Sequence, residues 1–506
     1  MREHVAVAAR PDLLLINPGN RAQIYQSLGH DLAAIEPPVW AGLMATFART
    51  HGYSVELLDA NAEQLTPAET AARVADVSPL LTAVVVYGHN PSASTQVMPA
   101  AGALCRAIRA HAPDTRLLMV GGHVSALPHR TMAEEAVDFV GVGEGVYTIV
   151  DLIDALRAGD GPDNVRGVMF RRNGSLHATP HPPLVQHLDR EMPGVAWDLL
   201  PMDRYRAHNW HGFGESSRTP YASLYTTLGC PYHCSYCCIQ APFKAGERAL
   251  GLTDSVNSYR MWSARHVVDQ IGILVDRYGV RHLKFADEMF VLNPRHVRAI
   301  CDLIIERGYP LNIWAYARVD TVSDDMPDLL KRAGINWLAV GIEAGAAHVR
   351  DDVAKSFTER QIVDTIARIR SAGINVIANY IFGLPEDTLE TMQATLDLAL
   401  ELNCEFANFY SAMAYPGSRL YQVALERGWT LPAHWSGYSQ HAVDTLPLPT
   451  RYLTAREVLR FRDEAFQTYF QRPAYRRMIG DTFGAAAVAD IERMAAHTLR
   501  REALAG

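Results

Sequence analysis

The strongest constraint on this chain is a short cysteine-rich loop, Gly229-Cys230-Pro231-Tyr232-His233-Cys234-Ser235-Tyr236-Cys237. Its cysteines have the spacing C-x-x-x-C-x-x-C and follow a strand-like run, Tyr221 to Leu228. Thiolates this close together suit a soft metal centre. A structural zinc site uses four ligands, whereas an iron–sulfur cube held by three cysteines leaves one iron open. We therefore predict that Cys230, Cys234 and Cys237 are metal ligands; a zinc knuckle or a group of buried thiols is the alternative.

The pattern C-x-x-x-C-x-x-C, with the aromatic Tyr236 before its last cysteine, resembles the signature of the radical S-adenosylmethionine (SAM) enzymes. The resemblance implies a [4Fe–4S] cluster whose open iron chelates the amino and carboxylate groups of SAM. One electron then cleaves SAM to methionine and a 5′-deoxyadenosyl radical, which abstracts hydrogen from an unactivated carbon. The adjacent Cys238 should point away from its neighbour, so we interpret it as a packed thiol and not as a fourth ligand.

The overall composition excludes several other classes of protein. The 506 residues suffice for two or three domains, and the net charge of −8 without a basic block gives no nucleic-acid surface. No apolar run is long enough to span a bilayer, and Met1 to Pro11 has no signal-peptide core. Seven cysteines, three of them clustered, do not form a disulfide framework. We therefore expect a cytoplasmic protein with no membrane partner.

Residues 10–160 show the alternation of a doubly wound, flavodoxin-like α/β domain. Five short apolar runs are separated by segments with helix signals, and runs this continuous fit parallel strands buried on both faces. They lie at residues 13–16, 55–58, 83–86, 117–120 and 139–142. Ligands bind such sheets outside the carboxyl ends of the strands.

Those strand ends carry polar residues and glycines, and their pattern resembles the cobalamin-binding domain that precedes the core in one radical SAM subfamily. The resemblance assigns to cobalamin Asn90, Pro91, Ser92, Ser94, Thr95, Gly121, Gly122, His123, Gly143, Glu144 and Gly145. None of the 20 histidines stands in the D-x-H-x-x-G pattern that supplies a cobalt ligand in many cobalamin proteins, so cobalamin is expected to bind without it. The alternative is a degenerate domain that binds nothing, in which His89 and His123 are only loop hydrogen-bonders.

Residues 161–217 are interpreted as a linker with a small hairpin that turns at Asn173-Gly174. Residues 218–428 then repeat a strand–helix unit, in which a glycine closes the helix before the next strand. These glycines are Gly279, Gly308, Gly334 and Gly373. We count six units, too few for a closed eight-stranded barrel, and the radical SAM family uses such a partial (β/α)6 barrel. Its site is expected at the carboxyl ends of the strands.

The polar residues at those strand ends form the predicted SAM shell. The resemblance assigns SAM to Tyr236, Asp287, Glu288, Arg318, Glu343 and Asn379. Acidic side chains suit the methionine ammonium, and an arginine suits the SAM carboxylate or a substrate anion. Each residue alone is a weak signal, since acids at strand ends often cap the next helix.

Residues 429–506 are predicted to form a small helical cap, with helices over 455–470 and 485–502. The polar–aromatic loop at 435–441 is a candidate substrate lid; a surface loop without a ligand is equally compatible with it.

These features predict a cobalamin-dependent radical SAM methyltransferase. The resemblance implies methyl transfer from methylcobalamin to an unactivated carbon of a small molecule, such as a natural-product intermediate, with a flavodoxin or ferredoxin as electron donor. The alternatives are a cobalamin-dependent rearrangement or cyclisation without methyl transfer, and a non-catalytic corrinoid- or metal-binding protein. No motif identifies the substrate or a catalytic side chain.

Overall fold

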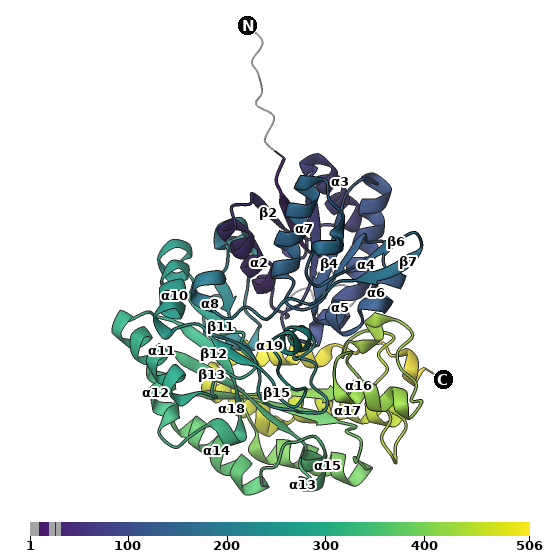
Figure 1. Cartoon of the computed structure of the whole chain (residues 1–506). Coiled ribbons are helices and arrows are strands. Elements are labelled where there is room, and N and C mark those ends of the chain that lie inside the picture. The colour runs from purple at the N-terminus through teal and green to yellow at the C-terminus, as the bar shows by residue number, and fades with distance from the viewer. Residues whose placement is uncertain (1–9, 20–25, 27–31, 506) are drawn as a thin grey trace.

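The computed structural model describes residues 10–19, 26 and 32–505. Of the segment Met1 to Pro11, all but Arg10 and Pro11 lies outside the described residues. Figure 1 shows an N-terminal α/β unit stacked on a larger α/β unit, with the C-terminal helices beside the second sheet. No helix of the described part is long and apolar enough to cross a membrane.

The N-terminal sheet confirms the five predicted strands. Its strand order is β2-β1-β3-β4-β5-β6-β7, in which the first five strands are parallel and the last two antiparallel. The strands are β1 (Leu13–Asn17), β2 (Val55–Asp59), β3 (Leu81–Val86), β4 (Leu117–Gly121), β5 (Phe139–Gly141), β6 (Val168–Arg172) and β7 (Ser175–Ala178). The hairpin predicted in the linker is β6–β7, and it extends this sheet. The strand order reverses between β1 and β3, which is where doubly wound sheets bind ligands.

Helices cover both faces of this sheet, as its apolar strands require. One face packs against α2 (Val39–Thr50) and α7 (Val146–Ala158). The other packs against α3 (Pro67–Val77), α4 (Ala93–His111), α5 (Gly122–Ala126) and α6 (Pro128–Glu134).

The second sheet is the predicted six-stranded partial barrel. Its strands are all parallel and lie in chain order, so its two outer strands do not pair with each other. They are β8 (Tyr221–Leu224), β11 (His282–Phe285), β12 (Asn312–Arg318), β13 (Ile335–Glu343), β14 (Asn375–Phe382) and β15 (Phe406–Ser411).

Helices join successive barrel strands, and the four predicted glycines follow them with positive φ, which glycine adopts without steric cost. The joining helices are α10 (Ala264–Tyr278), α11 (Pro294–Arg307), α12 (Met326–Arg332), α13 (Ala347–Asp352), α14 (Glu359–Ser371) and α15 (Leu389–Leu402), and α16 (Arg419–Glu426) follows the last strand. The connection after β8 is more elaborate: it contains β9 (Thr227–Gly229), α9 (Lys244–Ala249) and β10 (Tyr259–Met261), and β9 pairs with β10.

The linker between the two sheets packs against the barrel strands β12 and β13. It contains α8 (Leu188–Glu191) and short turns, η3 (Trp197–Leu199), η4 (Met202–Arg204) and η5 (Trp210–Gly212). The Trp210 ring lies 5.4 Å from the rings of both Trp314 and Trp337. The linker is therefore part of the barrel core.

The tail contains three helices, one more than predicted, because Pro473 and Gly484 divide the sequence into α17 (Ala455–Phe470), α18 (Pro473–Phe483) and α19 (Ala485–Ala496). The predicted end of the last helix at 502 is wrong; the chain continues into a short turn, η8 (Glu502–Leu504). The predicted 435–441 loop includes η7 (Trp435–Tyr438), whose two aromatic rings join the apolar cluster of the N-terminal sheet. This loop therefore joins the tail to the first domain.

Three buried histidines should make the fold sensitive to acid. Burial lowers the pKa of His123, His211 and His441 to about 3, from an ordinary 6.5. The unfolded chain takes up these protons below pH 6.5 while the folded chain does not, so stability falls as pH falls from 6.5 towards 3.

We expect each of these histidines to cost about 1.4 kcal/mol of unfolding free energy between pH 7.5 and 5.5. His211→Asn should remove its share of this pH dependence, whereas the matched change at the exposed His129 should leave it intact. Urea unfolding at pH 7.5 and pH 5.5 measures the loss of unfolding free energy in the wild type and in each variant. An equal loss in all three proteins would contradict the expectation.

Candidate functional site

The cysteine loop lies at the carboxyl ends of the barrel strands. Cys230 is buried, and Cys234 and Cys237 are half-buried. The Cys237 N–H donates to the Cys234 carbonyl oxygen at 3.1 Å, which closes a tight turn between these two cysteines. All seven cysteines are free thiols, as the absence of a disulfide framework predicted.

The arrangement of these thiols does not suit a single metal ion. Among the residues that the structure describes, no three His, Cys, Asp or Glu side chains come close enough to share one ion. In an iron–sulfur cube each cysteine binds a different iron, so the sulfurs lie further apart than around zinc. Burial raises the pKa of Cys230 to about 11 and the pKa of Cys237 well above its ordinary value, so metal loading must displace their protons.

Cys238 lies against the same space as its neighbour. It is buried, and burial raises its pKa to about 12. It lines the cavity described below together with Cys237, and also a small void beside Glu288. Cys238 is therefore buried, as predicted, and it also forms part of the cavity wall.

Asp287 supports the strand that leads into the cysteine loop. The carboxylate is fully buried and accepts hydrogen bonds from the Thr226 N–H (2.6 Å) and from the hydroxyls of Thr226 (2.5 Å) and Thr227 (2.9 Å). Burial raises its pKa to about 6 in spite of these bonds. The structure gives this predicted SAM residue partners within the protein, away from the cavity.

Glu288 and Glu343 do face the cavity. Burial raises the pKa of Glu288 to about 8; the positive charge of Lys284 opposes this shift, and the negative charge of Asp287 adds to it. Glu343 accepts hydrogen bonds from the Tyr236 hydroxyl (2.8 Å) and from Lys355 Nζ (2.7 Å). The predicted residues Tyr236, Glu343 and Glu288 therefore come together at one wall.

Arg318 is held against the cysteine loop. Its Nε and Nη2 donate to the two carboxylate oxygens of Asp320 at 2.9 and 3.1 Å, and its guanidinium lies 3.8 Å from the centre of the Tyr232 ring. The third nitrogen, Nη1, lies 3.7 Å from Cys234 Sγ and donates to it. A fixed positive N–H donor on a cluster sulfur stabilises the reduced, more negative cluster.

We expect Arg318→Gln to lower the midpoint potential of the reconstituted cluster. Losing one charged donor should reduce the reduced-to-oxidised ratio on the order of tenfold, about 59 mV for one electron. Potentiometric titration followed by electron paramagnetic resonance measures this shift. Arg298→Gln, which removes an exposed arginine paired with Asp325, is the control, and an equal shift in both variants would show that Arg318 has no specific effect.

A cavity of about 380 Å³ lies between the two sheets. Its lining comes from the carboxyl ends of strands in both, and from the linker and the tail. From the barrel it receives Tyr236, Cys237, Glu288, Glu343, Asn379 and Asn408, and from the N-terminal unit Asn90, Pro91, Ser92 and Gln96. Asn408 Nδ2 donates to Asn379 Oδ1 at 2.9 Å, so the amide wall is itself ordered.

The predicted cobalamin residues divide into groups. Besides the three that line the large cavity, Ser94 and Gly122 line a smaller void that reaches the barrel at Cys238 and Glu288. Gly121 permits close approach of β3, since a Cβ there would lie 2.1 Å from the Val86 carbonyl oxygen. Thr95, Gly143 and Gly145 lie in the same strand-end loops but line neither the large cavity nor this smaller void.

His123 and Glu144 have partners within the protein. The His123 ring is buried against Trp435, with its Nδ1 3.1 Å from Thr95 Oγ1. Glu144 forms an ion pair with Arg260 at 2.8 Å and accepts from the Val185 N–H. The structure thus uses Glu144 to connect the N-terminal unit to β10 and to the linker.

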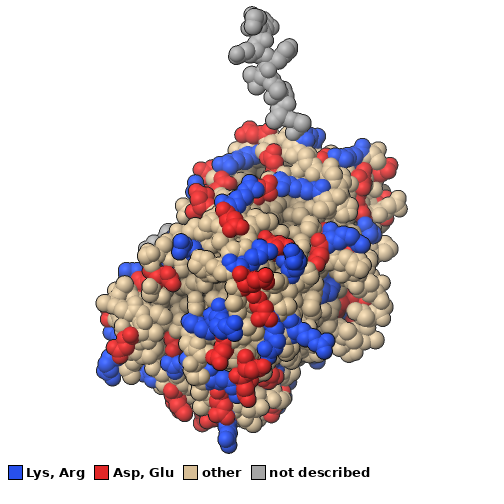
Figure 2. All heavy atoms as spheres, turned by 90° about the vertical axis from the view of Figure 1, so that its left-hand side faces the viewer, with Lys and Arg blue, Asp and Glu red and all other residues tan. Residues whose placement is uncertain are grey.

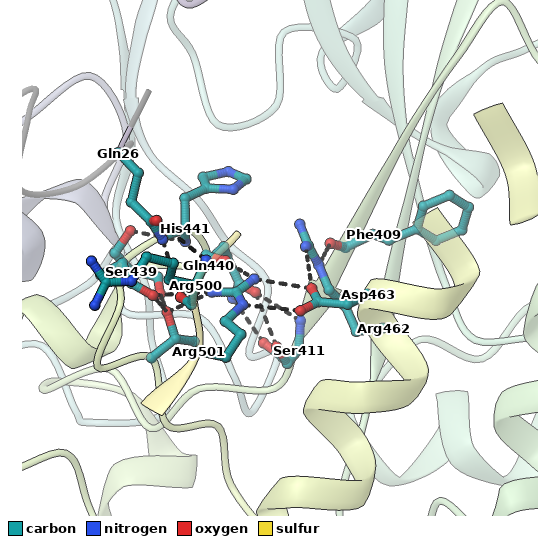
Figure 3. Close-up of polar contacts among 12 residues, drawn as sticks. Gln26, Phe409, Ser411, Ser439, Gln440, His441, Arg462, Asp463, Arg500 and Arg501 are labelled. Carbon is teal, nitrogen blue, oxygen red and sulfur yellow. Dashed lines mark hydrogen bonds and ion pairs between the residues drawn. The ribbon is translucent and has the colours of Figure 1, made fainter. Parts of the chain in front are cut away.

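One cavity wall comes from the tail, and sequence reasoning did not specify how it is held. Gln440 and His441 line the cavity, and the Gln440 side chain exchanges hydrogen bonds with both backbone groups of Ser411 (both 2.9 Å). Figure 3 shows Arg501 beneath this loop, donating to the Gln440 carbonyl oxygen and to both oxygens of Asp463. Arg462 donates to the same carboxylate from α17. We call Arg462, Asp463 and Arg501 the tail clasp.

Two family models match the chain: a B12 binding domain over residues 26–153 and the radical SAM superfamily over residues 224–399. The chain belongs to the radical SAM enzymes that carry a B12-binding domain. The cofactors of this family are SAM, a [4Fe–4S] cluster and cobalamin. Both matched segments coincide with the sheets that border the cavity.

Several known proteins are similar to this radical SAM chain over most of its length. It is 27% identical over 462 residues to an uncharacterized methyltransferase of Pyrococcus horikoshii, covering 91% of this chain and 93% of the relative. It is 25% identical to the anaerobic magnesium-protoporphyrin IX monomethyl ester cyclase of Rubrivivax gelatinosus, over 81% of this chain and 69% of that one. The solved structure of the methyltransferase TsrM from Kitasatospora setae, with cobalamin and a [4Fe–4S] cluster bound, superimposes with a TM-score of 0.67 at 18% identity, covering 91% of this chain and 89% of TsrM. That likeness shows a shared fold.

The residues present fit these cofactors. Three free thiols that do not share one ion, with a charged donor on one sulfur, suit a cluster. Uncharged amide and hydroxyl groups on the N-terminal wall, Asn90, Ser92 and Gln96, suit the amide-rich rim of a corrin.

Proposed function

We propose that this chain is a cobalamin-dependent radical SAM methyltransferase, which transfers a methyl group from cobalamin to an unactivated carbon of a small molecule. The observation that supports this most is the shared cavity, since Ser92 and its neighbours from the B12-binding domain lie on the same space as Cys237 and Glu288 of the barrel. Methyl transfer to a carbon that SAM chemistry has activated requires this proximity.

The residues of this chain then have distinct tasks. Cys230, Cys234 and Cys237 hold the cluster, and Tyr236, Glu288, Glu343 and Asn379 hold SAM. The strand-end residues Asn90, Pro91, Ser92, Ser94 and Gly122 face cobalamin. When bound, these groups supply one-electron cleavage of SAM and a transferable methyl group. Gln440 and His441 close the side of the cavity and exclude water from it.

The reaction partners in this proposal are a small-molecule substrate and a one-electron donor of the flavodoxin or ferredoxin type. On the face drawn in Figure 2, basic and acidic side chains are interspersed without a large patch of one sign. That face therefore presents no extended basic patch of the kind that binds nucleic acid.

Methyl-labelled SAM tests the proposal without knowledge of the substrate. The anaerobically reconstituted protein, supplied with cobalamin and a reductant, should transfer the label to cobalamin and form S-adenosylhomocysteine. It should form 5′-deoxyadenosine separately. If 5′-deoxyadenosine forms but cobalamin takes up no label and no S-adenosylhomocysteine appears, methyl transfer is excluded. The cyclisation chemistry named for the Rubrivivax relative then becomes the better hypothesis.

A further inference from the structure

A buried group of charged residues lines the same cavity as the cysteine loop. Lys284 of β11 is 1% exposed and donates through Nζ to both carboxylate oxygens of Glu36, at 2.9 and 3.3 Å. The Glu36 side chain is 7% exposed, and both residues line the cavity. Removing two charges from water costs several kcal/mol per ion and adds little net stability, so this position calls for a functional explanation.

Lys284 has no capacity left for a substrate anion. An ammonium group has three N–H donors. Two are directed to Glu36, and the third donates to the His89 carbonyl oxygen at 3.0 Å. The Lys284 charge is therefore neutralised by Glu36, and its donors are used within the protein.

Glu36 retains acceptor capacity. A carboxylate offers about four lone-pair positions, and Lys284 uses one on each oxygen. His208 lies beside it, with Nε2 at 3.8 Å from Glu36 Oε1, beyond hydrogen-bond length. The Ala34 N–H donates to His208 Nδ1 at 3.4 Å, which assigns the ring proton to Nε2. The group therefore presents a carboxylate acceptor and, next to it, one imidazole N–H donor.

Flat aromatic surfaces surround these polar groups. Trp210, Trp314, Tyr316 and Tyr410 line the same cavity, and the His208 ring is stacked on Trp210 at 5.5 Å. Such walls bind a planar ring by stacking, while a few convergent polar groups fix its orientation.

We propose that Glu36 recognises the substrate through an N–H donor, and that the substrate presents a flat ring bearing an amine, an amide or a nitrogen heterocycle. This inference rests on the proposed function, because it treats the cavity as the substrate site. A phosphate, phosphonate or carboxylate is disfavoured here, since it would face the Glu36 carboxylate, and the one cation that the described residues place against Glu36, Lys284, is already neutralised by it.

Three probes with the same ring and different charge test this proposal: benzylamine, benzamide and benzoate. Their dissociation constants for the reconstituted full chain are measured by ligand-observed nuclear magnetic resonance. We expect benzylamine and benzamide to bind at least about tenfold more tightly than benzoate, as expected for one hydrogen bond to a charged acceptor. Glu36→Gln, which keeps the shape of the side chain, should remove the advantage of benzylamine. Glu56→Gln, an exposed position on β2, should not.

Cobalamin uptake, followed by its visible absorbance, is measured on the same variants. Unchanged uptake by Glu36→Gln supports the assignment to substrate, whereas lost uptake would assign Glu36 to an amide of the corrin and overturn the proposal. Binding of benzoate as tight as that of benzylamine, or no binding of any probe, also overturns it. If Glu36→Gln does not fold, the wild-type series still decides. None of these measurements uses methyl transfer, so failure of the proposed function is recognised separately by the labelled-SAM test.

Discussion

Replacing Cys237 with serine should abolish cluster assembly and with it all SAM cleavage. A hydroxyl is a poor ligand for iron in place of a thiolate, and Cys237 is one of only three thiols on its loop that the spacing assigns to the cube. The loss of 5′-deoxyadenosine formation should exceed the roughly 10–100-fold that residues outside the ligand set typically contribute. Iron content, absorbance near the cluster bands and 5′-deoxyadenosine measure it.

The adjacent cysteine provides the matched control. Cys238 lines the same cavity, and we interpret it as a thiol that binds no metal. Cys238→Ser should therefore retain iron and SAM cleavage. If this variant loses iron as completely as Cys237→Ser, the assignment of three ligands is wrong.

Arg501→Ala should release the tail loop that walls the cavity. The Arg501 side chain donates to both oxygens of Asp463, to the carbonyl oxygens of Gln440 and Ala442, and to the Thr445 hydroxyl. Asp463 keeps Arg462 as its ion-pair partner in this variant, so the cost comes from the lost Arg501 hydrogen bonds, each of which typically contributes about 1.5–3 kcal/mol when a charged group takes part. We expect faster amide hydrogen exchange over residues 439–445, a lower melting temperature, and weaker binding in the cavity.

Arg500→Ala is the control for this prediction. Arg500 is exposed, and it contacts Gln26 through its backbone N–H and carbonyl oxygen, as Figure 3 shows. This variant should show the amide hydrogen exchange and the melting temperature of the wild type. Equal effects of the two substitutions would mean that the tail clasp does not hold the loop.

The repeated elements were predictable from the sequence because their signals are local. The five N-terminal strands are short apolar runs, and four of the six barrel strands, β11 to β14, follow a glycine that ends a helix, so neither signal depends on distant residues. In the tail, the helix α18 was missed between the two predicted helices; it begins at Pro473 and ends before Gly484. Proline at a first helical position and glycine after a last one were the available signals.

The candidate site was predictable only at the strand ends. The sequence places Glu288, Glu343 and Asn379 at the correct edge of the barrel, and the structure brings them to one cavity. It does not reveal that Asp287 and Glu144, at similar edges, are used by neighbouring backbone and side-chain donors. These donors come from other elements of the fold. A strand-end position alone therefore does not reveal whether a carboxylate faces the cavity or is bound by donors within the protein.

The sequence carries no local signal for the buried group of Glu36, Lys284 and His208 in the cavity. Glu36 precedes α2, Lys284 lies within β11, and His208 belongs to the linker. Their pairing depends on how three separate segments pack. A lysine within a barrel strand was the nearest available signal, since an unpaired buried lysine is costly.

Trp435 and Tyr438 complete the apolar cluster on the outer face of the first sheet, although more than 250 residues separate them from its last strand. A fragment comprising residues 10–178 alone would leave the α4 side of that cluster open to water. We therefore expect such an excised fragment to aggregate. The two halves of this protein are not interchangeable modules, and exchanging cobalamin domains between relatives would have to carry the distant aromatic pair along.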